Sequence, residues 1–245
     1  MIIAILTINR KPNYIHKCIT TIRRDYKGVI HLVVGGTDYS YIKKYGKGFV
    51  KHYLDEGHLE SNWRKACNGY IECLKLALPK HEGILVIEDD TTFKKGWYKQ
   101  FQQYLTFIRD KQFILSLGKA MDGSIAFANS KIPSAQLFLY RVNLRKDPGK
   151  PPIAFIICWF DSHAVYYPPD MPFKDIIAFM DKFGVKLSSM HDILIGYYMF
   201  RKLYPIYIAQ PFLAINVGAY NTHVGPITDR NDIEMTKWDF DNEIC

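Results

Sequence analysis

The chain has 245 residues, of which 48% are hydrophobic, 23% charged and 15% aromatic. This length and composition are typical of one large folded domain and exclude an intrinsically disordered chain. A chain of this size buries roughly 70–75% of its unfolded surface when it folds, so it needs no disulfide or metal to hold it together.

The net charge of +8 is unevenly distributed along the chain. Six acidic and only two basic residues lie in 228–245, so residues 1–227 carry a charge of +12. A basic body of this kind favours polyanionic ligands such as phosphates, nucleic acid or an acidic surface. A lysine-rich face that is simply solvated is the alternative, and charge alone does not separate the two.

Neither the cysteines nor the N-terminus indicates export. The five cysteines form no Cys-x-x-Cys pair and are odd in number, which predicts reduced, buried thiols. The opening apolar run of eight residues precedes the first charges, the reverse of a signal peptide, and a membrane span needs about 20 apolar residues. We therefore expect a cytoplasmic protein without a transmembrane segment.

The first half of the chain alternates apolar runs with helical patterns. Continuous apolar runs predict buried parallel strands at residues 2–8, 29–34 and 84–87. Pro12 opens a helical pattern, a second helix is expected at residues 63–78, and a basic loop punctuated by glycines precedes that second helix. Strands that alternate with helices predict a parallel sheet covered by helices on both faces.

The second half has a more mixed pattern. The apolar spacing predicts helices at residues 97–108, 175–183 and 192–203. Strands are expected at residues 113–117, 125–128, 136–142, 154–159, 163–167, 206–209 and 212–217, with 154–159 and 163–167 as candidate neighbours. Because we find no internal repeat and no low-complexity linker, the chain is predicted to form one mixed α/β domain.

Three consecutive acids, Glu88, Asp89 and Asp90, follow the third predicted strand. Adjacent carboxylates repel one another, and the carboxyl end of a parallel strand is where open α/β sheets bind ligands. A divalent cation held by one or two carboxylates and by substrate phosphates fits this position. The alternative is an acidic turn that caps the next helix.

The segment ILVIEDDTTFKKGWYKQF at residues 84–101 resembles the metal-binding segment of nucleotide-sugar glycosyltransferases of the GT-A fold. Its Glu-Asp-Asp resembles a variant of their DxD motif. Residues 62–69, NWRKACNG, resemble the helix that precedes this motif, although the Ala-Cys-Asn-Gly run is one residue tighter. LTINR at residues 6–10 resembles the first strand and nucleotide-contacting loop.

The resemblance implies one GT-A-like, Rossmann-like α/β domain with a mixed central sheet flanked by helices. It would occupy residues 1–227, with a nucleotide-sugar-binding half at 1–110 and an acceptor-side half at 111–227. Residues 228–245 would form an acidic C-terminal tail.

The resemblance also assigns roles at the donor site. Asp90 would ligate Mn²⁺ or Mg²⁺ that bridges the diphosphate of the nucleotide sugar. For Arg10 and Arg64, ordinary surface charge is the alternative. The residues implied to bind the nucleotide sugar are Thr7, Asn9, Arg10, Asp38, Arg64, Asn68, Glu88 and Asp89.

Four later residues are candidates for the reaction itself. Asp192 stands where a helix should begin and could deprotonate an acceptor hydroxyl, or it could cap that helix. His223, in a His-x-Gly element like one that closes the donor site in such enzymes, is a second metal ligand or a loop histidine bonded to backbone. Trp159 and Asp161 resemble an acceptor-side wall, and Trp159 could equally be core.

The resemblance therefore implies a metal-dependent glycosyltransferase that moves a sugar from a UDP-sugar to an acceptor hydroxyl. Asp192 as base would favour inversion, whereas a retaining enzyme would need no such base. Enzymes of this kind in the Golgi carry a membrane anchor, and no transmembrane segment is expected here. A bacterial enzyme, or a viral one in the host cytoplasm, therefore fits better. The acceptor is either a hydroxymethylated pyrimidine in DNA, which the basic body and the aromatic residues would suit, or a surface glycan or lipid-linked glycan.

Two other classes remain as alternatives. A nucleotidyltransferase that makes an activated sugar would use a similar sheet and metal carboxylates. Those enzymes usually carry a glycine-rich loop after the first strand, where this chain reads TINRKPN. A non-enzymatic nucleic-acid-binding protein would use the same basic surface but leaves the three adjacent acids unexplained.

Overall fold

The computed structural model describes residues 1–57, 59, 62–118, 127–130, 138–142, 162–187 and 191–217. The strands in this part of the chain are β1 (Ile2–Ile8), β2 (Ile30–Gly35), β3 (Phe49–Tyr53), β4 (Ile84–Glu88), β5 (Thr91–Phe93), β6 (Ile114–Ser116), β7 (Phe127–Ser130), β8 (Phe138–Val142), β9 (Ala164–Tyr167), β10 (Ile206–Gln210) and β11 (Ala214–Asn216). The helices are α1 (Ile15–Asp25), α2 (Asn62–Lys75), α3 (Trp97–Phe107), α4 (Phe173–Leu187) and α5 (His191–Lys202), with a short 3₁₀ turn at Ser40–Ile42.

Nine of these strands form one mixed sheet in the order β3-β2-β1-β4-β9-β6-β10-β8-β7. The first four run parallel, and β9 lies antiparallel between β4 and β6. The remaining strands, β5 and β11, pair as a small antiparallel ribbon. This arrangement confirms the predicted α/β fold with a mixed central sheet flanked by helices.

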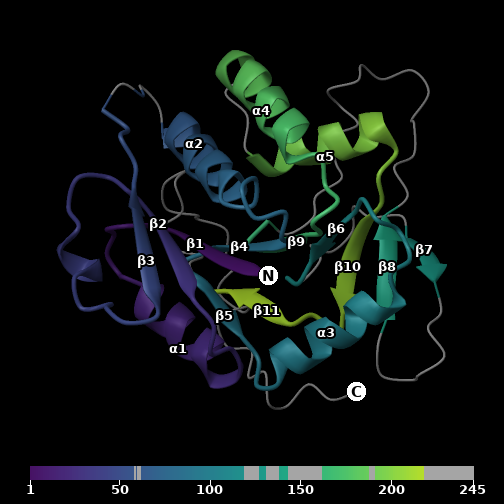
Figure 1. Cartoon of the computed structure of the whole chain (residues 1–245), viewed down its shortest axis with the longest axis horizontal. Helices are drawn as coiled ribbons and strands as arrows, with labels where there is room; N and C mark the ends of the chain where they lie inside the picture. Colours follow the sequence, from purple (N-terminus) through teal and green to yellow (C-terminus); the bar gives the residue numbers. More distant parts are fainter. Residues whose placement is uncertain are drawn as a thin grey trace, which may run out of the picture.

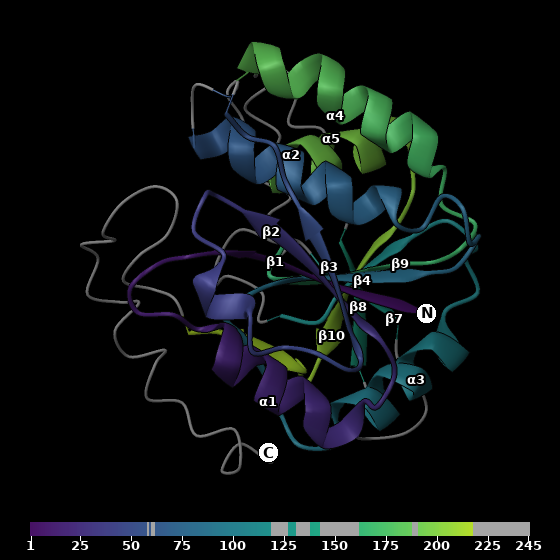
Figure 2. The same ribbon diagram turned by 60° about the vertical axis from the view of Figure 1, so that its left-hand side comes forward.

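Helices cover both faces of the sheet, as the alternating pattern predicts (Figures 1 and 2). Along β1, Ala4 and Leu6 belong to the core beneath α2, α4 and α5, which also contains the fully buried Tyr70. Ile3 and Ile5 belong to the opposite core beneath α1 and α3. Because β1 is buried on both faces, its sequence is continuously apolar instead of alternating.

The structure differs from the prediction at one helix start and at one strand that was not predicted. The helix that follows Pro12 begins three residues later, at Ile15, and buries the predicted face of Ile15, Cys18, Ile19 and Ile22. Residues 49–53, predicted as loop, form the edge strand β3, which pairs in parallel with β2. This strand was missed because it is only half-buried and carries Lys51 and His52, so its backbone pairing leaves no apolar signal.

The cysteine prediction holds for the three cysteines that the structure describes. Cys18, Cys67 and Cys73 are buried free thiols. Burial raises the pKa of the Cys67 thiol to about 12, so this side chain packs as a small apolar group. Among the described helices, none is both long enough and apolar enough to cross a membrane.

Helix α2 approaches β1 closely at Gly69. A Cβ atom at this position would lie 2.5 Å from Leu6 Cδ1, inside the van der Waals limit. We therefore expect Gly69→Ala to lower the free energy of unfolding by about 1–3 kcal/mol, because the added methyl group must displace the buried Leu6 side chain. Urea denaturation measures the change, and Gly46→Ala, which would meet nothing within 4 Å, is the matched control. Equal losses in the two variants would contradict the close approach.

Two histidines on neighbouring strands give the fold a pH dependence. His31 Nδ1 lies 2.9 Å from His52 Nε2, and the two rings stack. Burial, His52 and Lys80 lower the pKa of His31 to about 4, whereas an unfolded histidine titrates near 6.5. The unfolded chain therefore binds the proton more tightly, so this contribution to stability is complete above about pH 6.5 and is lost as the pH falls toward 4.

Replacing His31 with Gln removes this titration. Between about pH 7 and pH 4.5 we expect the wild type to lose about 1–2 kcal/mol more stability than His31→Gln, a figure reduced because the ring is partly exposed to solvent. Urea denaturation at the two pH values measures the difference, with the exposed His81→Asn as control. Parallel pH profiles for wild type and His31→Gln would refute the prediction.

Candidate functional site

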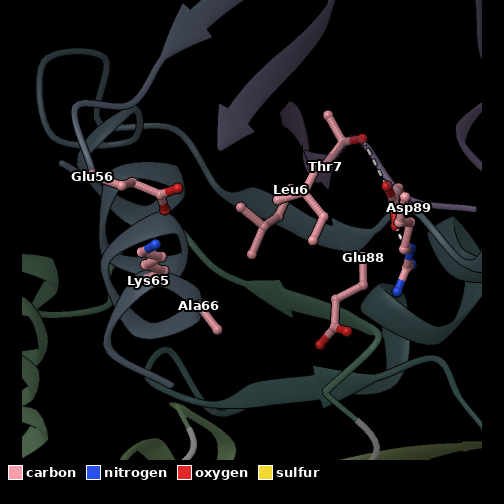
Figure 3. A pocket seen from close by; sticks show the side chains of 9 residues that line it. Leu6, Thr7, Glu56, Lys65, Ala66, Glu88 and Asp89 are labelled. Atoms are coloured by element: carbon pink, nitrogen blue, oxygen red, sulfur yellow. Dashed lines mark hydrogen bonds and ion pairs between the residues drawn. The ribbon is translucent and has the colours of Figure 1, made fainter. Parts of the chain in front are cut away.

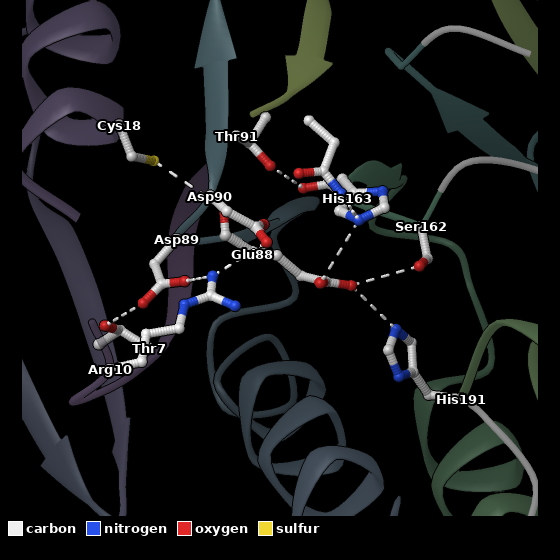
Figure 4. Close-up of polar contacts among 11 residues, drawn as sticks. Thr7, Arg10, Cys18, Glu88, Asp89, Asp90, Thr91, Ser162, His163 and His191 are labelled. Carbon is white, nitrogen blue, oxygen red and sulfur yellow. Dashed lines mark hydrogen bonds and ion pairs between the residues drawn. The ribbon is translucent and has the colours of Figure 1, made fainter. Parts of the chain in front are cut away.

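The three adjacent acids lie where β4 ends, beside the end of β1 (Figure 4). The backbone N–H of Asp89 donates to the carbonyl of Leu6 at 3.1 Å, and the N–H of Glu88 donates to the carbonyl of His163 at 2.9 Å. The carbonyl of Asp90 accepts from the N–H of Val217 at 2.7 Å. Backbone bonds to three separate segments therefore hold the acids in place at the carboxyl edge of the parallel strands.

Asp89 faces the first strand. Thr7 Oγ1 donates to Asp89 Oδ2 at 2.7 Å, and the Arg10 guanidinium donates to Asp89 Oδ1. The Asp89 side chain is buried, so ionised oxygens here require these partners. Thr7 and Arg10, which were predicted to bind the nucleotide sugar together with Asp89, thus both contact Asp89.

Arg10 also contacts Asp90, with its Nη2 2.9 Å from Asp90 Oδ2. Burial lowers the pKa of Arg10, but the charges of Asp89 and Asp90 raise it by more, so the guanidinium stays charged. Burial in turn raises the pKa of both aspartates, and Arg10 opposes that rise. Arg10 therefore supplies part of the positive charge that offsets the repulsion among the three adjacent acids.

Glu88, Asp90 and His163 form a cluster that could hold a metal ion. One potential ligand atom from each residue lies within 4.8 Å of the other two. Asp90 Oδ1 is buried, and the described residues provide no hydrogen-bond partner for it, which is what a ligand oxygen for a cation requires. Two carboxylates and one imidazole are ligands that Mn²⁺ accepts, and Mg²⁺ is held in proteins by one or two carboxylates.

A pocket adjoins this cluster (Figure 3). Its empty volume is about 370 Å³, including space open to solvent, and it extends from the ends of β1 and β4 to the start of α2. Glu56 and Lys65 lie at the end remote from Asp89. The lining residues are Leu6, Thr7, Ile8, Arg10, Glu56, Lys65, Ala66, Glu88 and Asp89.

The other predicted donor-site residues lie on nearby elements. Asn9 Nδ2 donates to Asp38 Oδ2 at 2.5 Å, so these two residues are in contact as a pair at the ends of β1 and β2. Arg64 and Asn68 are on α2, but the lining of the pocket comes from their neighbours Lys65 and Ala66.

The predicted acceptor-side residues are less completely placed. Asp192 is the second residue of α5 and is buried, close enough to Tyr167 for its charge to raise the pKa of that phenol further than burial alone does. Trp159, Asp161 and His223 lie outside the described residues, so their predicted roles remain predictions.

Sequence reasoning assigned no role to two histidines that contact Glu88. His163 Nε2 lies 3.7 Å from Glu88 Oε2, and His191 Nε2 lies 3.3 Å from Glu88 Oε1. His163 immediately precedes β9, and His191 is the first residue of α5. Nothing in the sequence shows that β9 inserts beside β4, and that insertion is what brings His163 to the cluster.

Comparison with known proteins supports the fold. No family model and no curated protein matches the sequence. Among solved structures, the chain is similar to S. aureus TarS residues 1–349 in complex with UDP, with a TM-score of 0.51 and 14% identity over 88% of this chain and 60% of that one.

Two other solved structures are similar at the same level. A 4-diphosphocytidyl-2C-methyl-D-erythritol synthase from Anaerococcus prevotii has a TM-score of 0.50 and 14% identity, over 96% of this chain and 95% of that one. A Bacillus anthracis protein described as a glucose-1-phosphate thymidylyltransferase has a TM-score of 0.50 and 11% identity, over 98% and 96% of the two chains. The chain has the α/β fold shared by these proteins. At such low identity the likeness extends to the fold alone.

Proposed function

We propose that this protein is a metal-dependent glycosyltransferase that moves a sugar from a nucleoside-diphosphate sugar to an acceptor hydroxyl. The observation that carries the proposal is the cluster of Glu88, Asp90 and His163 beside a pocket at the carboxyl edge of the parallel strands. That edge is where open α/β sheets bind nucleotides, and hard carboxylate ligands suit a cation that also binds phosphate.

The pocket supplies groups for the diphosphate and for the ribose of a UDP-sugar. Arg10 provides a buried guanidinium that can donate to phosphate oxygens, and Thr7 and Asp89 provide a hydroxyl and a carboxylate for ribose. Mn²⁺ or Mg²⁺ bound by Glu88, Asp90 and His163 would offset the charge that develops on the departing diphosphate. The structure of TarS residues 1–349, which shares the fold, holds UDP, which makes UDP the first nucleotide to test.

Direct displacement with inversion requires a base for the acceptor proton. Asp192 is the carboxylate we propose for this role, because α5 begins beside the cluster, where His191 contacts Glu88. Asp192→Asn should lower turnover about 100-fold while leaving the binding of UDP and Mn²⁺ unchanged. Single-turnover rates and nucleotide binding, measured on the same preparation, separate the two effects, and unchanged turnover would remove Asp192 from the mechanism.

A hydroxyl on either DNA or a glycan is chemically suitable as acceptor. The net charge of +8 favours a polyanion, so duplex DNA containing hydroxymethylated pyrimidine is one class to test, and a surface or lipid-linked glycan is the other. Transfer of radiolabelled sugar to each class, with unmodified DNA as control, distinguishes them. Binding to DNA that weakens steeply with salt supports only the first class.

A nucleotidyltransferase would use the same fold, so one specific feature must separate the two activities. The segment between β1 and α1 contains Asn9, Arg10, Lys11 and Pro12 and no glycine, whereas a loop that wraps a triphosphate with backbone N–H groups needs glycines. Release of pyrophosphate from a nucleoside triphosphate and a sugar 1-phosphate would overturn the glycosyltransferase proposal.

The proposal is tested first by thermal stability with UDP, GDP, ADP and CMP, each with and without Mn²⁺. A ligand at 100 times its dissociation constant adds about 2.7 kcal/mol to the free energy of unfolding. We expect UDP to raise the unfolding temperature only when Mn²⁺ is present. If no nucleotide stabilises the protein with or without the metal, the donor site does not exist and plain nucleic-acid binding becomes the alternative to test.

A further inference from the structure

We propose that His191 is a positioning residue that orients the Glu88 carboxylate for metal binding. This inference rests on the metal centre proposed above and assigns a role to a residue outside the ligand set. His191 comes from α5, a different element from those that carry Glu88, Asp90 and His163. Figure 4 shows His191 approaching the Glu88 carboxylate from the side away from Asp90.

The Glu88 carboxylate has two distinct sides. Its Oε2 lies 3.7 Å from His163 Nε2, on the side of the metal cluster. Its Oε1 accepts from Ser162 Oγ at 3.3 Å and lies 3.3 Å from His191 Nε2. One oxygen is thus turned toward the candidate ligands, and the other is turned toward donors that can hold it there.

Packing holds the His191 ring in this position. The ring stacks on Tyr70 of α2 with a centroid distance of 4.3 Å and an interplanar angle of 20°. Tyr70 is fully buried, and its hydroxyl lies 2.9 Å from that of Tyr167 on β9. The His191 side chain is itself only 11% exposed. The imidazole is therefore held between α2 and the end of β4 and has little freedom to turn away.

The Nε2 atom of His191 needs an acceptor. It is buried, and within the described residues no acceptor is aligned with it for a hydrogen bond. The Glu88 oxygen 3.3 Å away is the group that can satisfy it after a small rotation of the carboxylate. If Oε2 were a ligand beside Asp90 and His163, Oε1 would remain able to accept from Nε2–H. Such outer partners of ligating carboxylates typically change metal affinity 10- to 100-fold.

The test is the Mn²⁺ dissociation constant of the metal-free protein, titrated with MnCl₂ and followed by the electron paramagnetic resonance signal of free Mn²⁺. His191→Phe keeps the stacked ring and removes the donor, so we expect the dissociation constant to rise about 10-fold or more. His191→Asn, whose amide is too short to reach Glu88, should raise the dissociation constant as much as His191→Phe does. This second variant keeps the test valid if the phenyl ring disturbs folding. His191→Gln carries an amide N–H near the position of Nε2 and should stay within about threefold of wild type.

Two controls separate this role from a structural one. Thermal unfolding without metal should be similar for wild type and His191→Gln, and exposed His81→Asn, before β4 at the opposite edge of the sheet, should bind Mn²⁺ as wild type does. If wild type binds Mn²⁺ and Asp90→Asn does not, while His191→Phe and His191→Asn bind normally, the positioning role is wrong and the metal centre stands. If wild type fails to bind Mn²⁺ even with UDP present, both proposals are wrong.

Discussion

Asp90→Asn should lower sugar transfer about 1,000-fold and abolish the stabilisation that requires both UDP and Mn²⁺. The substitution keeps the shape of the side chain and removes the charge of the buried carboxylate, whose Oδ1 has no hydrogen-bond partner among the described residues. A bound cation contributes several kcal/mol of charge stabilisation in the transition state, and each 1.36 kcal/mol corresponds to a factor of ten in rate.

The loss should be specific to the metal. Burial alone disfavours the charged form of Asp90, so the neutral amide should leave the protein folded in the absence of metal. Exposed Asp170→Asn, in the turn after β9, removes the same charge beyond the end of β9 that is opposite His163, and should transfer sugar at the wild-type rate. Transfer by Asp90→Asn that remains fast and responsive to Mn²⁺ would show that the cluster is not the metal centre.

Arg10→Gln should destabilise the metal-free protein by about 3–5 kcal/mol, because it leaves Asp89 and Asp90 buried side by side without their shared guanidinium. For a chain of this length, that loss lowers the unfolding temperature by about 10 °C. Calorimetry in a chelating buffer measures the change. Exposed Arg109→Gln, a matched removal of one guanidinium, should change stability by less than about 0.5 kcal/mol.

Mn²⁺ should reverse part of this loss. A dication at Asp90 supplies the charge that Arg10 no longer provides, so Mn²⁺ should raise the unfolding temperature more in Arg10→Gln than in wild type. UDP should then bind more weakly to the variant, because a donor to phosphate has been removed. An Arg10→Gln protein that unfolds at the wild-type temperature would show that the guanidinium does not neutralise these acids.

The sequence was informative about the parallel half of the sheet. Continuous apolar runs bury on both faces wherever they pair, so residues 2–8 and 84–87 are strands in any arrangement that covers them. The same argument placed Glu88, Asp89 and Asp90, because side chains after adjacent parallel strands meet at one edge. Thr7 and Arg10 follow for the same reason, since β1 pairs with β4 along its length.

The partners of those acids could not be predicted in the same way. Arg10 was expected at the nucleotide, and its contacts with Asp89 and Asp90 depend on how the loop after β1 folds back. His163 reaches Asp90 because β9 inserts antiparallel beside β4, although the two lie 73 positions apart in the chain (163 − 90). No local periodicity records which strand becomes a neighbour, since strand order depends on the burial of the whole sheet.

What the sequence by itself determined is therefore the local part of this protein: its buried strands, the inward face of α1, and the chemistry of three acids at a strand end. These follow from the spacing of apolar and charged residues, which acts over a few residues. Only the tertiary structure decided that Arg10 neutralises two acids, that His163 completes a cluster, and that His191 faces Glu88. Those contacts join segments far apart in the chain, and they exist only after packing has chosen one arrangement of the sheet and its helices.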